Sequence, residues 1–265
     1  MIGAIIGDIV GAPYEGRLSN RKSKDFPFFS WRSKFTDDTV CTIAVADCLL
    51  EKGDFAPYLR RYYALHPKAG YGGMYAKWAR TPDMGPYNSW GNGSAMRVSP
   101  VPYVAQDETE LLDLAAASAA VTHNHPDGIA GAQALALAMW RACTGTSAPD
   151  IREEIADRFA YDLSRSVDEI RPKYKFDVSC AGSVPQAVTC ALEAVDFEDA
   201  IRNAVSIGGD SDTIACMAGG LAECLFDIPP DMIKTARNFL TFDLLAVVDR
   251  FDREVIRPQS DRALD

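Results

Sequence analysis

Residues 126–143 read PDGIAGAQALALAMWRAC, and this stretch decides the fold class. A proline followed by an acidic residue is typical of the first turn of a helix. Ala130, Ala134 and Ala138 recur every fourth residue, so they share one face of that helix. Most of the other positions are apolar as well, which predicts a helix buried on nearly all sides in a compact helical protein.

The same helical period recurs along most of the chain, and alternating strand-like segments are almost absent. Gly3, Gly7 and Gly11 form a second stripe of small residues, which predicts close contact with a neighbouring helix. We therefore expect an all-α, single-domain fold over residues 1–257, with a flexible tail at 258–265. The predicted helices span residues 2–12, 39–52, 54–65, 107–122, 126–143, 148–160, 184–195, 197–206, 212–226 and 236–255.

The composition is that of a globular chain, with 265 residues of which 48% are hydrophobic and 24% charged. A net charge of −10 argues against non-specific nucleic-acid binding, which needs a basic surface to displace counterions. The seven cysteines form no CxxC pair, and we interpret them as buried apolar side chains in a reducing compartment. The apolar N-terminus lacks a basic region, and the apolar runs are too short to span a bilayer, so we expect a cytoplasmic protein.

Two short segments place acids and hydroxyls directly before apolar helices. Residues 36–39 read TDDT, and residues 208–213 read GGDSDT. If both helices begin at the same end of the fold, four carboxylates converge and repel one another unless cations lie between them. Oxygen ligands favour Mg²⁺ or Mn²⁺ over Zn²⁺, and two ligand sets allow two ions. The alternative is that each segment is only a helix cap.

A third acidic element is residues 7–15, GDIVGAPYE. Asp8 lies inside an apolar helix, where a carboxylate needs partners, so we interpret it as a structural residue bonded to backbone or to an arginine. Glu15 follows the helix-breaking Pro13 and is available as an acid, a base or a metal ligand.

Two long segments, 16–35 and 66–94, have no regular pattern and contain many aromatic residues. The first is also basic, which is consistent either with a solvated loop or with docking of an anionic acceptor such as a nucleic acid or an acidic protein face. In the second, Trp90 either stacks on an adenine or packs the loop onto the helices, and packing is favoured for its aromatic neighbours. These neighbours are Tyr71, Tyr75, Trp78 and Tyr87.

The ordered set GDxxGxxxE, TDDT, GNGSAMR (residues 91–97), Thr122-His123 and GGDSDT resembles the ADP-ribosylglycohydrolase family, which includes the dinitrogenase reductase-activating glycohydrolase. The resemblance covers residues 3 to 226. It implies a compact orthogonal helical bundle with a dinuclear Mg²⁺ or Mn²⁺ centre. The basic insert between Glu15 and Thr36 departs from the family pattern and concerns the acceptor side of the substrate.

Carried over position by position, the resemblance implies roles for individual residues. Glu15, Asp37 and Asp212 are implied in catalysis. The metal ligands would be Thr36, Asp37, Asp38, Asp210, Asp212 and Thr213. The residues implied in binding ADP-ribose are Asn88, Ser89, Trp90, Gly91, Asn92, Gly93, Ser94, His123 and Val178. His125 is interpreted as a helix-start residue instead.

The predicted function is hydrolysis at C1″ of an ADP-ribosyl group, which breaks a glycosidic or O-acyl bond and releases ADP-ribose. The modified partner would be a protein, a nucleic acid or O-acetyl-ADP-ribose, with no membrane and no stable nucleic-acid binding. The competing hypothesis is a non-catalytic ADP-ribose-binding or crystallin-like structural relative. The complete set of acidic positions favours the enzyme, since a structural relative is expected to have lost some of them.

Overall fold

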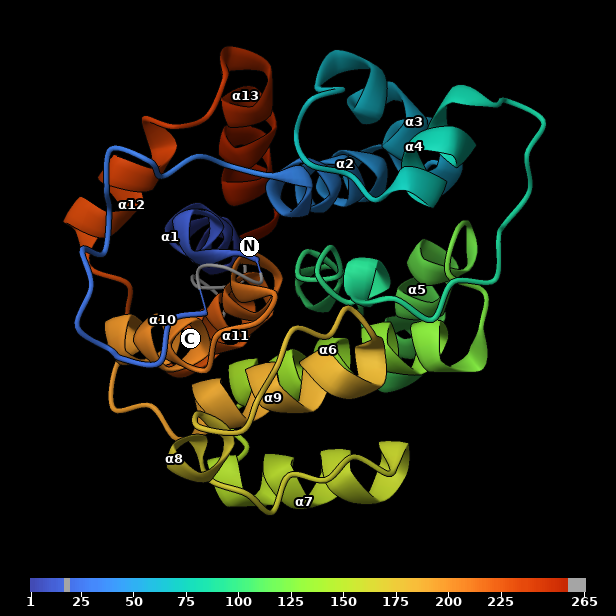
Figure 1. Cartoon of the computed structure of the whole chain (residues 1–265). Coiled ribbons are helices and arrows are strands. Elements are labelled where there is room, and N and C mark those ends of the chain that lie inside the picture. The colour runs from blue at the N-terminus through green and yellow to red at the C-terminus, as the bar shows by residue number, and fades with distance from the viewer. Residues whose placement is uncertain (17–19, 257–265) are drawn as a thin grey trace.

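The computed structural model describes residues 1–16 and 20–256, and within these residues the fold is all-α (Figure 1). One isolated β-bridge, between Gly91 and Ser179, lies outside the helices. Short 3-10 turns at Ala12–Tyr14, Asn92–Ser94 and Val101–Tyr103 join longer elements. The helices are α1 (Ile2–Gly11), α2 (Asp37–Glu51), α3 (Phe55–Leu65), α4 (Gly73–Arg80), α5 (Glu108–Ala120), α6 (Pro126–Cys143), α7 (Ala148–Phe159), α8 (Val167–Ile170), α9 (Cys180–Leu192), α10 (Phe197–Ser206), α11 (Ser211–Leu225), α12 (Pro230–Arg237) and α13 (Phe242–Phe251).

Helices α1 and α11 pack against each other more extensively than any other two helices, although the end of α1 and the start of α11 are 200 positions apart in the sequence. A Cβ added to Gly7 would lie 1.9 Å from the carbonyl oxygen of Ala215, and one on Gly3 would lie 2.3 Å from that of Gly219. Only glycine allows backbones to approach this closely. The predicted small-residue stripe is therefore confirmed, and it fixes how α1 lies against α11.

The remaining helices surround this pair in two groups (Figure 1). Helix α6 packs against α5, α9 and α11, and most of its middle turns are buried, as its apolar sequence predicts. Helix α7 covers the outer side of α6 and α9. Helix α2 packs against α3 and α13 in the other group. The amino-terminal ends of α2 and α11 are the feature that matters for function.

Several predicted boundaries differ from the structure. The predicted helix 236–255 is two helices, because Thr241 begins α13 in an extended conformation after α12 has ended. Helix α9 begins at Cys180 rather than at residue 184, because Ser179 caps it and Pro185 is accommodated inside it. Helix α4 lies within the segment predicted to be irregular. The predicted tail at 258–265 lies outside the described residues.

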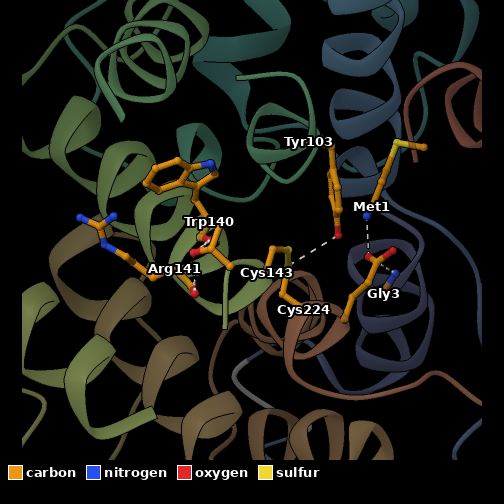
Figure 2. Close-up of a disulfide and its surroundings, with 9 residues drawn as sticks. Met1, Gly3, Tyr103, Trp140, Arg141, Cys143 and Cys224 are labelled. Carbon is orange, nitrogen blue, oxygen red and sulfur yellow. Dashed lines mark hydrogen bonds and ion pairs between the residues drawn. A yellow bond between two sulfur atoms is a disulfide. The ribbon is translucent and has the colours of Figure 1, made fainter. Parts of the chain in front are cut away.

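The interpretation of the cysteines as unpaired is wrong for two of them (Figure 2). Cys143 at the end of α6 and Cys224 near the end of α11 form a disulfide, with their Cα atoms 4.6 Å apart. Their sequence separation of 81 residues leaves no spacing signal, since the pairing is set by where the two helices end. The other five cysteines are buried and free, as predicted: Cys41, Cys48, Cys180, Cys190 and Cys216.

No helix among the described residues is long and apolar enough to cross a membrane. The expected cytoplasmic location stays a prediction.

Candidate metal and substrate site

The two acidic segments meet at the amino-terminal ends of α2 and α11, beside the carboxy-terminal half of α1. Thr36 caps α2, and its hydroxyl accepts a hydrogen bond from the backbone N–H of Asp38 at 3.3 Å. Asp210 is the residue before α11, and Asp212 lies in its first turn. Oxygens of Asp8, Asp38 and Asp212 lie within 4.8 Å of one another, as do oxygens of Glu15, Asp210 and Asp212. The predicted convergence of carboxylates is thus present in the fold.

Asp8 holds the start of α2 onto α1. Its carboxylate accepts hydrogen bonds from the backbone N–H and the hydroxyl of Thr36 at 2.8 and 2.7 Å, and from the same two groups of Thr39 at 3.2 and 2.5 Å. The expected structural role is therefore present in its backbone form, through the N–H groups of Thr36 and Thr39, and the two threonine hydroxyls add to it. The proximity of Asp8 to Asp38 and Asp212 is a second property, which the sequence analysis did not predict.

Burial among like charges raises the pKa of every aspartate in this cluster. Burial first, and the neighbouring Asp8 second, raise the pKa of Asp37 to about 7. Burial likewise raises the pKa of Asp210 to about 6, with a further contribution from Glu15. The pKa values of Asp38 and Asp212 are raised well above the usual range for the same two reasons. Cations between the carboxylates would relieve this repulsion.

The donor set fits a hard divalent cation. Oδ1 of Asp38 is a buried carboxylate oxygen without a hydrogen-bond partner, an arrangement that costs free energy unless another group satisfies the oxygen. Its other oxygen, Oδ2, accepts a hydrogen bond from the Thr213 hydroxyl at 3.3 Å. All of these ligand atoms are oxygens, as Mg²⁺ and Mn²⁺ prefer.

A cavity of about 450 Å³ opens directly over the carboxylates, a size typical of small-molecule sites. Of the residues singled out from the sequence, Asn88, Trp90 and Ser94 do not line it. Asn88 bonds through its backbone to Asn124, the Trp90 side chain is half exposed, and the Ser94 hydroxyl donates to the Gly128 carbonyl at 2.7 Å. Those that line it are Glu15, Thr36, Asp37, Asp38, Tyr75, Tyr87, Ser89, Gly91, Asn92, Gly93, His123, Val178, Asp210, Asp212 and Thr213.

The loop that carries Asn92 connects the carboxylates to the rest of the cavity. The Asn92 side-chain amide donates to Asp210 at 2.7 Å and to the Ser183 hydroxyl at 3.1 Å. Its backbone N–H donates to the carbonyl of Val178 at 2.8 Å, and the N–H of Gly91 donates to the Ser89 hydroxyl. A Cβ on Gly93 would lie 3.1 Å from Nε2 of His123, so glycine lets the loop approach the imidazole.

A buried chain of hydrogen bonds, not predicted from the sequence, orients His123. Arg97 donates to the Thr122 hydroxyl at 2.8 Å, and this hydroxyl lies 2.7 Å from Nδ1 of His123. Burial, with the nearby Arg97 charge, holds the pKa of His123 well below its usual value. The imidazole is therefore neutral. A Thr122 hydroxyl that accepts from Arg97 can still donate its own proton to Nδ1, and in that tautomer the imidazole presents Nε2–H as a donor toward the cavity.

Met96 and Arg97 of the GNGSAMR motif also line the cavity, and several further lining residues belong to no motif. Lys34, Ala69, Gly70 and Phe176 lie on segments without a regular pattern. Phe176 and Val178 are both partly exposed. Apolar residues within an irregular segment are the one feature of the sequence that indicates a contact surface here.

Part of the basic insert packs against neighbouring elements, whereas Trp31, Arg32 and Lys34 are exposed. The Lys22 ammonium donates to the carbonyls of Tyr174 and Ile207, so it joins the loop that carries Phe176 and Val178 to the segment that leads into Asp210. Lys24 forms an ion pair with Asp199 on α10 at 2.8 Å. The sequence interpretation as a solvated loop is therefore wrong for Lys22, whereas the Lys24 side chain keeps 41% of its surface exposed. Arg17 lies outside the described residues.

Comparison with known proteins agrees with this geometry. The model of the family described as ADP-ribosylglycohydrolase matches residues 1–261. The chain belongs to this family. The resemblance drawn from the ordered motifs is thereby confirmed.

Curated relatives of this ADP-ribosylglycohydrolase family member are similar over most of their length. ADP-ribosylhydrolase ARH3 of Mus musculus is 26% identical, with 93% of this chain and 88% of that protein covered. ADP-ribosylarginine hydrolase Tri1 of Pseudomonas putida is also 26% identical, with 88% and 72% covered. A solved structure described as an ADP-ribosylglycohydrolase-related protein complex has a TM-score of 0.70 at 24% identity, covering 95% of this chain and 96% of that one. This similarity confirms the predicted fold.

His125 takes the role of a helix-start residue. It precedes α6, and its Nδ1 accepts a hydrogen bond from the backbone N–H of Asp127 at 3.2 Å.

Proposed function

We propose that this chain is a metal-dependent ADP-ribosyl hydrolase that breaks the bond between C1″ of the distal ribose and its acceptor. The observation that carries the proposal is the pair of acidic helix starts that converge under a cavity whose other wall is the Gly91–Gly93 loop with His123. Membership of the ADP-ribosylglycohydrolase family and the names of its relatives support it.

Two Mg²⁺ or Mn²⁺ ions are assigned to the carboxylate cluster. The proposed ligands are Thr36, Asp37, Asp38, Asp210, Asp212 and Thr213, and Asp8 keeps the Thr36 ligand in place through its hydrogen bonds. Bound there, such ions supply Lewis-acid polarisation and hold the vicinal hydroxyls of a ribose.

The protein's own groups then account for the remaining chemistry. Glu15 lies next to Asp210 and Asp212 and is positioned to take a proton from the water that attacks C1″. The new bond forms between the water oxygen and C1″, while the electron pair of the breaking bond goes to the acceptor atom, which gains a proton as it leaves. Positive charge that develops at C1″ is stabilised by the surrounding carboxylates.

The rest of ADP-ribose is assigned to the opposite part of the lining. The backbone N–H groups of Gly91 and Asn92 already have hydrogen-bond partners. We therefore assign binding of the diphosphate to Nε2–H of His123 and to the Ser89 hydroxyl. Val178 and Phe176 supply an apolar surface for the adenosine. A role in binding ADP-ribose rests on the family resemblance alone for Asn88, Trp90 and Ser94, which do not line the cavity.

The purified protein tests this proposal when it is incubated with Mg²⁺ or Mn²⁺ and substrates carrying ADP-ribose on arginine, serine or a nucleobase, together with O-acetyl-ADP-ribose. Free ADP-ribose, measured by chromatography, is the expected product from at least one of them, and EDTA abolishes its release. If ADP-ribose binds by calorimetry while no substrate is hydrolysed, the competing view of a non-catalytic binding protein is correct.

A further inference from the structure

A second cavity, of about 510 Å³, opens beside the first and shares Lys34 and Ala69 with its lining. The two cavities adjoin near Asp37, since a Cβ added to Gly70, which follows Ala69, would lie 3.2 Å from Oδ1 of Asp37. The second cavity therefore meets the first along Lys34 and Ala69, beside the carboxylate of Asp37, which belongs to the cluster where the proposed function places C1″. A group that leaves C1″ has this cavity next to it.

The walls of the second cavity are mostly apolar. Phe35 lies on one side, Leu65 and Pro67 on another, and Phe239 closes it from the segment after α12. The Leu65 side chain keeps 52% of its surface exposed although it ends a helix with a well-buried face. An exposed apolar side chain at the edge of an apolar cavity is a typical feature of a binding surface.

Two cations complete the lining. Lys34 and Lys68 are both exposed, and neither forms an ion pair with a carboxylate in the part of the chain that the structure describes. His66, the third titratable group of the lining, bonds instead to Asp243 at 2.8 Å. In a protein with a net charge of −10, the described residues that line this cavity thus include two lysines and no carboxylate.

We propose that the second cavity, which we call the acceptor groove, binds the protein acceptor through a segment in which an acidic and an apolar side chain flank the ADP-ribosylated residue. The inference rests on the proposed function, because that function places the scissile bond over the carboxylates of the first cavity, next to the edge that the two cavities share. The apolar walls take the apolar flank, and Lys34 with Lys68 take the acidic one.

The groove fits a peptide better than a nucleic-acid strand. Its two aromatic rings are already engaged, since Phe35 meets His66 edge-on at 5.9 Å and Phe239 stacks on Phe29 at 6.1 Å. Strand binding needs free ring faces for bases and a row of cations for successive phosphates. Two ammonium groups match one or two carboxylates.

The test uses ADP-ribosylated peptides that carry either arginine or serine at the modified position. Each is made with Glu and Leu flanks, with Gln and Leu flanks, and with Lys and Leu flanks, and compared with the same ADP-ribosylated amino acid without flanks. An ADP-ribosylated single-stranded DNA is the further arm. The variant is Lys68→Glu, and Lys77→Glu is the matched control, because Lys77 is an exposed lysine of α4 that lines neither cavity.

In the wild type, we expect the Glu peptide to exceed the Gln peptide in kcat/KM. In Lys68→Glu, the ratio of kcat/KM for the Glu peptide to that for the flankless substrate falls about fivefold through KM, as expected for one exposed charge pair reversed. In the same variant, the corresponding ratio for the Lys peptide rises. In Lys77→Glu, all of these ratios equal those of the wild type. Equal ratios in all three proteins overturn the acceptor groove, and so does a Lys68 effect confined to the DNA substrate.

A second readout separates this inference from the proposed function. If the wild type hydrolyses no substrate, the proposed function fails, and the groove is then judged from the affinity of a fluorescent unmodified Glu-and-Leu peptide, measured by anisotropy. Binding that weakens with salt and is lost in Lys68→Glu supports the groove. Absence of binding to the wild type at millimolar peptide overturns it.

Discussion

Asp212 belongs to both acidic groups of the site, which makes it the most informative single position. Asp212→Asn keeps the shape of the side chain and removes one charge from a crowded cluster. We expect Mg²⁺ to stop raising the melting temperature and activity to fall on the order of 10²-fold or more. Without metal the variant should be at least as stable as the wild type, because one repelling charge is gone.

The control for this variant is Asp47→Asn. Asp47, in α2, is a buried aspartate like Asp212. It lies outside the cluster, and its carboxylate accepts a hydrogen bond from the Tyr62 hydroxyl at 3.0 Å. Asp47→Asn should lower the free energy of unfolding, and Mg²⁺ should raise its melting temperature as much as that of the wild type. A normal Mg²⁺ response in Asp212→Asn would contradict the ligand assignment.

The raised pKa values of the cluster predict how the metal-free protein responds to pH. Asp37 and Asp210 have pKa values of about 7 and about 6, against the ordinary 3.8. Between pH 4 and pH 7 the folded protein binds more protons than the unfolded chain, so the free energy of unfolding falls as pH rises. We expect a loss of about 2 kcal/mol or more across this window in EDTA, measured by urea denaturation.

Saturating Mg²⁺ should flatten that pH dependence. Cations keep the carboxylates ionised in the folded state, so the difference in bound protons between the two states decreases. A free energy of unfolding that rises with pH in EDTA would show that the carboxylates are ionised without a metal.

Single residues also show which parts of the site could be predicted. The acids and threonines of the acidic cluster were predictable, because each lies in a short polar segment next to an apolar helix. Asp8 was placed correctly as a bonded residue, but its nearness to Asp212 depends on how α1 lies against α11. Arg97 was not predicted as the residue that orients His123, because the contact spans two loops.

At the scale of elements, Gly7→Ala tests the α1 and α11 contact. The added Cβ would lie 1.9 Å from the Ala215 carbonyl oxygen, so the helices must separate. We expect a loss of about 3 kcal/mol in the free energy of unfolding by chemical denaturation, and a weaker Mg²⁺ response because Asp8 and Asp212 move apart.

Gly85→Ala is the matched control, since a Cβ there meets no atom within 4 Å and the residue is outside the positive-φ set. It should leave stability within about 0.5 kcal/mol of the wild type. A Gly7→Ala protein as stable as this control would show that α1 has room to shift on α11.

Elements with strong periodicity were predicted within a few residues, and elements without it were not. Helix α4 begins directly after Gly72 and has only eight residues, so its pattern is too short to stand out from the glycines before it. A single helix was predicted over 236–255 because the residues on both sides of Thr241 have helical apolar spacing. The break follows from the extended backbone at Thr241, which periodicity alone does not show.

At the scale of the whole molecule, the Cys143–Cys224 disulfide closes a long loop across α6 and α11. Cross-linking residues 81 positions apart restricts the unfolded chain, which in the chain-entropy account contributes roughly 4 kcal/mol. We expect dithiothreitol to lower the urea midpoint of the wild type, and to leave that of Cys143→Ala unchanged.

Thiol counting provides the control. Alkylation of the unfolded protein without reductant should modify five cysteines, and seven after reduction, as read by mass spectrometry. Seven modified cysteines without reductant would mean that the purified protein does not hold the disulfide.

The pairing of α1 with α11 also has a consequence during synthesis on the ribosome. All ten residues of α1 are buried in the finished fold, yet its main partner is translated 200 residues later. At about 5 to 20 residues per second, the nascent chain presents this apolar segment for roughly 10 to 40 seconds before α11 emerges. During that interval the segment is a natural target for chaperones, and a ribosome that stalls before α11 leaves an aggregation-prone fragment with only one of the two acidic helix starts.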